Sequence, residues 1–163
     1  MALNGPWTQE KQARIPIKVE DIVQQGIACV NAGAAIVHVH AYDEETGRQK
    51  DDVDVYKKII EGIRTEVDAI VYPTVSASGM NPIDERSTGE DRYAHIESLA
   101  KDGFLEWTVL DPGSCNFSHY DQLKEDKVGY VYQNSEADAR HGMGVAHKYG
   151  LHPSYAIYEP GFA

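Results

Sequence analysis

The sequence is poor in several features, and each shortage argues against a class of protein. Its 163 residues include only two cysteines, Cys29 and Cys115, and neither has a Cys-x-x-Cys partner. This argues against a disulfide scaffold and favours a reducing compartment. No apolar run approaches the about 20 residues that a membrane span requires. The N-terminus lacks a basic segment followed by an apolar one, so we expect no signal peptide and a cytoplasmic protein.

Positive charge is also scarce. Fifteen Lys and Arg residues face 26 Asp and Glu residues, which gives a formal net charge of −11. Such a chain is a poor match for the phosphate backbone of nucleic acids or for an anionic membrane surface. Hydrophobic residues make up 42% and charged residues 25%, an ordinary balance for a globular protein. The length favours a single domain over residues 1–163.

Strand-like and helix-like segments alternate along the chain. Short runs rich in small, branched and aromatic residues predict strands at residues 2–5, 34–40, 69–75, 105–110 and 154–158. Apolar residues at helical spacing predict helices at residues 18–31, from 51 onward, 82–100 and 135–149, with a short extended piece at 128–132. Gly142 and Gly144 weaken the last of these helices.

This alternation predicts an α/β fold of parallel βαβ units. The units recur at a spacing close to that of a (β/α)8 TIM barrel, which takes about 250 residues when complete. We therefore expect an incomplete barrel, about the first half, with four to five βα units. A complete flavodoxin-like sheet of five strands is the competing architecture, and it fits the length better.

The strongest local signal for chemistry is His38-Val39-His40 at the end of the second predicted strand. Alternate residues of a strand point to the same side, so the two imidazoles can converge on one ion. A catalytic zinc takes about four ligands and keeps one position open, so other strand ends would complete the site. The alternative is that both histidines form local hydrogen bonds and bind no metal.

Polar residues also follow the other predicted strands, where the active site of a barrel lies. They are Asn4, Ser76, Ser78, Asp111, Ser114 and Glu159. Each one alone is compatible with ordinary turn chemistry, but polar groups at successive strand ends indicate a shared site. We take Ser76, Asp111 and Ser114 as candidate catalytic residues beside the candidate metal ligands His38 and His40.

Several of these segments, in order, resemble the β-keto acid cleavage enzymes, the family of 3-keto-5-aminohexanoate cleavage enzyme. The similar segments are residues 2–5, 16–21, 31–43, 110–117, 132–134 and 150–159. The His-x-His strand and the run Gly113-Ser114-Cys115-Asn116-Phe117 are the most specific of them.

The resemblance implies a TIM barrel with one Zn²⁺ per subunit, usually in a homotetramer. It also implies a retro-Claisen-type reaction, in which a β-keto acid and acetyl-CoA give acetoacetate and a new acyl-CoA. By this resemblance His38 and His40 are zinc ligands, and the metal acts as a Lewis acid on the substrate. Ser76 and Ser114 then lie near the family's substrate-contacting hydroxyls.

The chain departs from the family pattern in one large respect. The family's third zinc ligand, a glutamate, and its catalytic arginine and aspartate lie in the second half of the barrel, and no residue here matches them. The run at residues 76–79 also departs from the family's threonine- and glycine-rich segment. We therefore expect this chain alone to bind zinc weakly or not at all and to be inactive. An amidohydrolase-like metal hydrolase and a non-catalytic half-barrel are the alternatives.

Overall fold

The computed structural model describes residues 1–75, 88–118, 120–127 and 129–158. The helices are α1 Val19–Asn31, α2 Val53–Glu66, α3 Gly89–Lys101, α4 Tyr120–Lys124 and α5 Glu136–Tyr149. The strands are β1 Ile36–Val39, β2 Tyr42–Asp43, β3 Arg48–Gln49, β4 Ile70–Pro73, β5 Trp107–Leu110, β6 Cys115–Phe117, β7 Tyr130–Tyr132 and β8 His152–Tyr155. The elements form the mixed α/β arrangement that the sequence predicts.

The long strands form two parallel pairs, β1 with β4 and β5 with β8. Ala2 forms a parallel bridge to His38 on one side of β1, and β4 pairs with the other side. Strand β5 packs next to β4 and pairs in parallel with β8. In a flavodoxin-like sheet the second strand lies at an edge, whereas here it lies between the first and the third. The order is compatible with part of a TIM barrel, although the described residues form no closed barrel.

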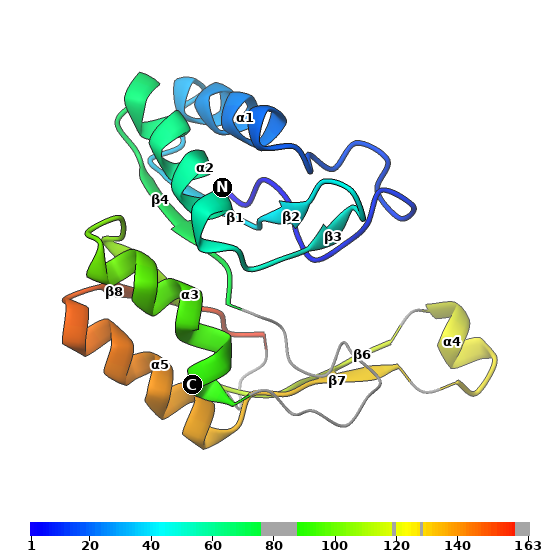
Figure 1. The fold of residues 1–163 in the computed structure, drawn as a ribbon. Coiled ribbons are helices and arrows are strands. Elements are labelled where there is room, and N and C mark those ends of the chain that lie inside the picture. Colours follow the sequence, from blue (N-terminus) through cyan, green and yellow to red (C-terminus); the bar gives the residue numbers. More distant parts are fainter. Residues whose placement is uncertain (76–87, 119, 128, 159–163) are drawn as a thin grey trace.

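Four helices cover the strands in two pairs. Helix α1 packs on α2, and α3 packs on α5 (Figure 1). The first pair approaches closely, because a Cβ at Gly26 would lie 2.5 Å from the Ile63 side chain. Val37 and Val39 are fully buried, as is Ile59 of α2. Since Val37 and Val39 pack into the core, the alternating residue His38 faces the other side of β1.

The helices begin and end at capping residues. The Asp52 side chain accepts hydrogen bonds from two backbone N–H groups at the start of α2. Thr88 and Ser135 form capping boxes at α3 and α5, and Gly150 ends α5 with a φ of 66°. The helices predicted at residues 18–31 and 135–149 are confirmed nearly to the residue. The first part of the one predicted at 82–100 lies outside the described residues.

The sequence did not predict two antiparallel hairpins, although the extended piece expected at residues 128–132 corresponds to β7. Strand β2 pairs with β3 directly after the His38-Val39-His40 strand, and β6 pairs with β7. Cys115 begins β6. The second hairpin extends away from α3 and α5 toward α4 (Figure 1). Among the described residues, no helix has the length and apolar character needed to cross a membrane.

Candidate active site

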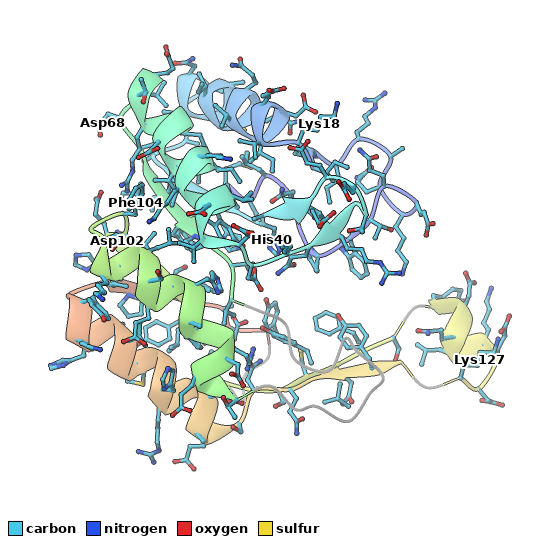
Figure 2. The ribbon with its side chains drawn as sticks, in the orientation of Figure 1. Lys18, His40, Asp68, Asp102, Phe104 and Lys127 are labelled. Atoms are coloured by element: carbon cyan, nitrogen blue, oxygen red, sulfur yellow. The ribbon has the colours of Figure 1, made fainter. Side chains whose placement is uncertain are left out.

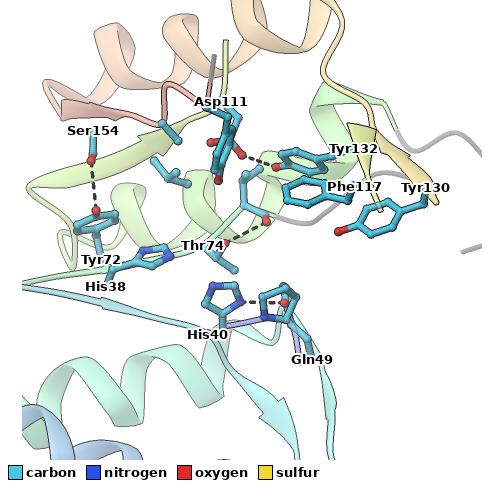
Figure 3. A pocket seen from close by; sticks show the side chains of 15 residues that line it. His38, His40, Gln49, Tyr72, Thr74, Asp111, Phe117, Tyr130, Tyr132 and Ser154 are labelled. Atoms are coloured by element: carbon cyan, nitrogen blue, oxygen red, sulfur yellow. Dashed lines mark hydrogen bonds between the residues drawn. The ribbon is translucent and has the colours of Figure 1, made fainter. Parts of the chain in front are cut away.

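A cavity of about 270 Å³ lies at the C-terminal ends of the parallel strands. Strands β1, β4, β5 and β8 or the residues just after them contribute to it, and the β6–β7 hairpin forms one wall (Figure 3). The residues that line it are Pro6, His38, His40, Gln49, Tyr72, Thr74, Val75, Val109, Asp111, Phe117, Tyr130, Tyr132, Ser154, Ala156 and Tyr158. This is the location at which barrel enzymes carry their active sites.

His38 and His40 both line this cavity. Their ring centroids are 5.2 Å apart, and the ring planes meet at 83°. The alternation of β1 produces this arrangement, because Val37 and Val39 point into the core. Figure 2 shows His40 in the interior, whereas Lys127 lies at the far end of the molecule beside α4. The structure thus brings the two candidate metal ligands together.

Burial keeps both imidazoles neutral at ordinary pH. It lowers the pKa of His38 from 6.5 to about 3, with further lowering by the neighbouring His40 and the N-terminal ammonium group. Burial also lowers the pKa of His40, while a hydrogen bond to Gln49 and the charge of Asp51 act in the opposite direction. A neutral imidazole offers a lone pair to a metal ion, so these rings need not lose a proton to become ligands.

Two amide side chains hold His40 in place. Nδ1 of His40 lies 2.8 Å from Oε1 of Gln49. The Asn4 side chain forms two hydrogen bonds with the backbone of His40. Oδ1 of Asn4 accepts from the His40 N–H at 2.8 Å, and Nδ2 of Asn4 donates to the His40 carbonyl at 3.1 Å. Asn4, noted above only as a polar strand end, therefore ties the first segment of the chain to the end of β1.

Asp111 lies in the same cavity, directly after β5. It is 5% exposed, and its Oδ2 accepts a short hydrogen bond from the Tyr132 hydroxyl. Its Oδ1 is buried and has no hydrogen-bond partner in the structure. Burial raises the pKa of Asp111, and the Tyr132 hydrogen bond and the positive charge of Arg92 partly oppose this. A buried carboxyl group with a raised pKa and one unpartnered oxygen can hold or transfer a proton.

The two candidate serines differ from this picture. The Ser114 hydroxyl donates to the Asn134 carbonyl at 2.9 Å and accepts from the Asn134 N–H at 2.8 Å. It therefore joins two loops and is not one of the cavity-lining residues. Its catalytic role stays a prediction, and the pairing gives it a structural role. Ser76 lies outside the described residues, as do Ser78 and Glu159.

Sequence reasoning missed several cavity residues. Thr74 follows β4 as His40 follows β1, and it is only 7% exposed. The strand-end rule that selected Ser76 could have selected it. Gln49 and Tyr132 reach the cavity through the two unexpected hairpins, so no strand-end pattern indicated them. His95 of α3 is buried behind Thr74 and is not one of the cavity-lining residues; its Nε2 lies 2.8 Å from the Thr74 carbonyl oxygen.

The donors at this site fit a metal ion in part. His38 and His40 are neutral nitrogen donors, and Nδ1 of His38 is buried with no hydrogen-bond partner. Such an orphaned nitrogen costs free energy unless something binds it. Over residues 1–75, 88–118, 120–127 and 129–158, no three His, Cys, Asp or Glu side chains are grouped to hold a metal. The described residues thus offer two nitrogen donors, fewer than the about four ligands that zinc takes.

Comparison with known proteins covers the whole chain. The family described as beta-keto acid cleavage enzyme matches residues 1–163. A 3-dehydrocarnitine:acetyl-CoA trimethylamine transferase of Rhizobium meliloti (strain 1021) is 27% identical over 168 residues, 94% of this chain and 52% of that protein. A 3-keto-5-aminohexanoate cleavage enzyme of Fusobacterium nucleatum subsp. nucleatum is 26% identical over 156 residues, 94% of this chain and 49% of the relative.

A 3-keto-5-aminohexanoate cleavage enzyme of Acetoanaerobium sticklandii is 31% identical over 114 residues, which are 68% of this chain and 36% of the relative. The chain spans about half the length of the first two relatives.

Proposed function

This chain belongs to the β-keto acid cleavage enzyme family, and we propose that it carries part of the active site of a zinc-dependent acyltransferase. In the proposed reaction a β-keto acid and acetyl-CoA give acetoacetate and a new acyl-CoA. The names of two relatives, a 3-dehydrocarnitine:acetyl-CoA trimethylamine transferase and a 3-keto-5-aminohexanoate cleavage enzyme, support this reaction class. The proposed architecture is part of a (β/α)8 barrel, which the parallel strands in chain order support.

One observation carries the proposal. Two neutral imidazoles and a buried carboxyl group with a raised pKa line the same cavity at the ends of parallel strands. A zinc ion held there would act as a Lewis acid toward the keto group of the substrate. His38 and His40 would hold the ion, and Gln49 would orient His40.

Asp111 has the second role in this proposal. Burial raises the pKa of Asp111 toward neutral pH, so its carboxyl group can hold or transfer a proton at Oδ1. Tyr132 keeps the other oxygen occupied and so directs any transfer through Oδ1. Thr74 lines the cavity beside them, and we propose that its hydroxyl contacts the substrate.

The described residues provide two zinc ligands, so further ligands have to come from elsewhere in the protein. We therefore expect this chain by itself to bind zinc weakly and to show no turnover. We also propose that the protein is cytoplasmic, and the resemblance makes a homotetramer the expected assembly. Size-exclusion chromatography with light scattering measures the oligomeric state.

The test is an assay for acetoacetate and acyl-CoA, run with a panel of β-keto acids on the full product of the gene. We expect acetoacetate to form only when acetyl-CoA and zinc are both present. His40→Ala should abolish it, whereas His147→Ala, on the exposed surface of α5, should not. Hydrolysis of an amide or ester without acetyl-CoA would instead support a metal hydrolase. Full activity of His40→Ala would contradict the proposed site.

A further inference from the structure

We infer that Gln49, oriented by Asp51, is a positioning residue that fixes His40 as the tautomer protonated at Nδ1, so that Nε2 is the nitrogen offered to a metal ion. This deepens the proposed function and rests on it for the identity of the ion. The tautomer itself follows from hydrogen-bond chemistry and can be measured in the metal-free protein.

A short turn places Gln49 beside His40. The Asp43 side chain accepts hydrogen bonds from the backbone N–H groups of Glu45 and Thr46 at 3.0 and 2.9 Å. Gly47, with a φ of 64°, completes the turn. The chain then reverses into β3, where Gln49 pairs with Tyr42. Gln49 thus lies next to His40, the residue that follows β1.

The orientation of the Gln49 amide follows from its second partner. Nε2 of Gln49 lies 3.3 Å from Oδ1 of Asp51, and Oε1 lies 2.8 Å from Nδ1 of His40. If the amide were turned over, its oxygen would face the Asp51 oxygen, and two acceptors would oppose each other. The Asp51 carboxylate accepts only, so the amide N–H₂ must point toward it. The Gln49 oxygen then has to face His40.

Asp51 is in turn held by a buried phenol. The Tyr56 hydroxyl donates to the same Oδ1 of Asp51 at 3.1 Å, and Tyr56 is fully buried in α2. Both donors meet one oxygen, which fixes that oxygen as an acceptor. Tyr56 lies in the second turn of α2, so helix packing keeps the Asp51 carboxyl group within reach of Gln49.

The tautomer of His40 is therefore determined by its neighbours. Oε1 of Gln49 can only accept a hydrogen bond, so Nδ1 of His40 must carry the proton. An imidazole that carries its single exchangeable proton at Nδ1 has its lone pair at Nε2. Within the described part of the chain, no protein hydrogen bond is made to Nε2. A partner on the far ring nitrogen is the usual way in which proteins orient a metal-bound histidine.

The first test measures the tautomer by long-range ¹H–¹⁵N correlation of the histidine side chains in the metal-free chain. We expect His40 to be protonated at Nδ1 in the wild type. Gln49→Leu should give a mixture of tautomers or the Nε2–H form. Gln25→Leu, the same change on the exposed face of α1, should leave His40 unchanged. An Nε2–H form in the wild type, or no change in Gln49→Leu, would overturn the inference.

The second test measures zinc affinity by competition with a chromophoric chelator. Loss of the orienting partner should weaken binding by about 10- to 100-fold in Gln49→Leu, whereas Gln25→Leu should keep the wild-type affinity. Equal affinity in Gln49→Leu and the wild type would overturn the positioning role. Absence of zinc binding in every variant would remove the metal-positioning role of Gln49, and the tautomer measurement would still decide the orientation of His40.

Discussion

Burial of the His38 imidazole couples the stability of the fold to pH. The unfolded chain takes up a proton on this ring near pH 6.5, whereas the folded chain does so only near pH 3. Stability from this group is therefore complete above pH 6.5 and is lost progressively as the pH falls. The difference amounts to about 2 kcal/mol at pH 5 relative to pH 7.

His38→Gln removes the titrating ring, so we expect its free energy of unfolding to change less between pH 7 and pH 5 than that of the wild type. Urea unfolding at several pH values measures this. Replacement of exposed His147 by Gln provides the control and should keep the wild-type slope. Parallel pH profiles for the wild type and His38→Gln would mean that the ring titrates normally in the folded chain.

The hydroxyl of Tyr132 is expected to control the protonation of Asp111. Its hydrogen bond to Oδ2 opposes the effect of burial on the Asp111 pKa. Tyr132→Phe removes that bond, so the pKa of Asp111 should rise further above its ordinary value. A ¹³C carboxyl titration measures the change. Tyr130→Phe alters the same hairpin and should leave the Asp111 pKa unchanged; a pKa unaffected by Tyr132→Phe would contradict this role.

Among the elements, helix α5 contains two glycines that differ in their surroundings. A Cβ at Gly142 would lie 2.5 Å from Cζ of Tyr93 and 2.8 Å from Cδ1 of Leu110. A Cβ at Gly144 would meet no atom within 4 Å. Gly142 thus permits the close contact of α5 with α3 and β5, whereas Gly144 only lowers helix propensity.

Gly144→Ala should therefore stabilise the fold by about 0.5–1 kcal/mol, the gain in helix propensity. Gly142→Ala should destabilise it by about 1–3 kcal/mol, because the core has to shift to accommodate the methyl group. Thermal unfolding of the two variants measures both effects. Stabilisation by both substitutions would contradict the packing of α5 against Tyr93.

A buried arginine joins helix α3 to the start of α5. Nη2 of Arg92 donates to Oδ1 of Asn134 at 2.7 Å, and Nη1 lies 3.6 Å from the Asp138 carboxylate. Arg92→Met should cost about 1–3 kcal/mol, since it leaves the buried Oδ1 of Asn134 without its donor. The exposed pair of Arg140 with Glu136 gives a matched control, and Arg140→Met should change stability by less than about 1 kcal/mol. Equal losses in urea unfolding would contradict this role of Arg92.

The elements that the sequence predicted correctly have a periodic signal. Helix α2 has apolar residues at helical spacing. In and just after β1, buried Val37 and Val39 alternate with His38 and His40. The hairpin β2–β3 has only two residues in each strand and depends on the side chain of Asp43. Periodicity cannot indicate so short an element, so Gln49 could not be assigned to the site from the sequence.

The site shows the same division. The spacing of His38 and His40 and the position of Asp111 after a strand were enough to predict that these three residues lie close together. The structure has all three in one cavity. The hydrogen bonds of Ser114 to Asn134 depend on where a distant loop folds back. That loop follows strand β7, whose pairing with β6 was not predicted, so the pattern Gly-Ser-x-Asn-Phe alone could not show that this hydroxyl is paired.

At the scale of the whole molecule, the parallel strands end together around one cavity. The cavity lies at the ends of β1, β4, β5 and β8, next to the N-terminal segment that bridges to β1 at Ala2. The residues that line it therefore come from distant parts of the sequence. A metal ion at this position would bind His38 and His40, which both come from the end of β1. His38 and His40 should therefore respond to zinc as one site, even if the binding is weak.

A zinc titration of the ¹⁵N-histidine-labelled chain tests this most directly. We expect the imidazole signals of His38 and His40 to shift together with one dissociation constant, while those of exposed His147 stay in place. Alanine at either position should remove the response of the other histidine. Zinc-dependent shifts confined to other histidines, or a response at His40 that persists in His38→Ala with the same dissociation constant, would contradict the shared metal site.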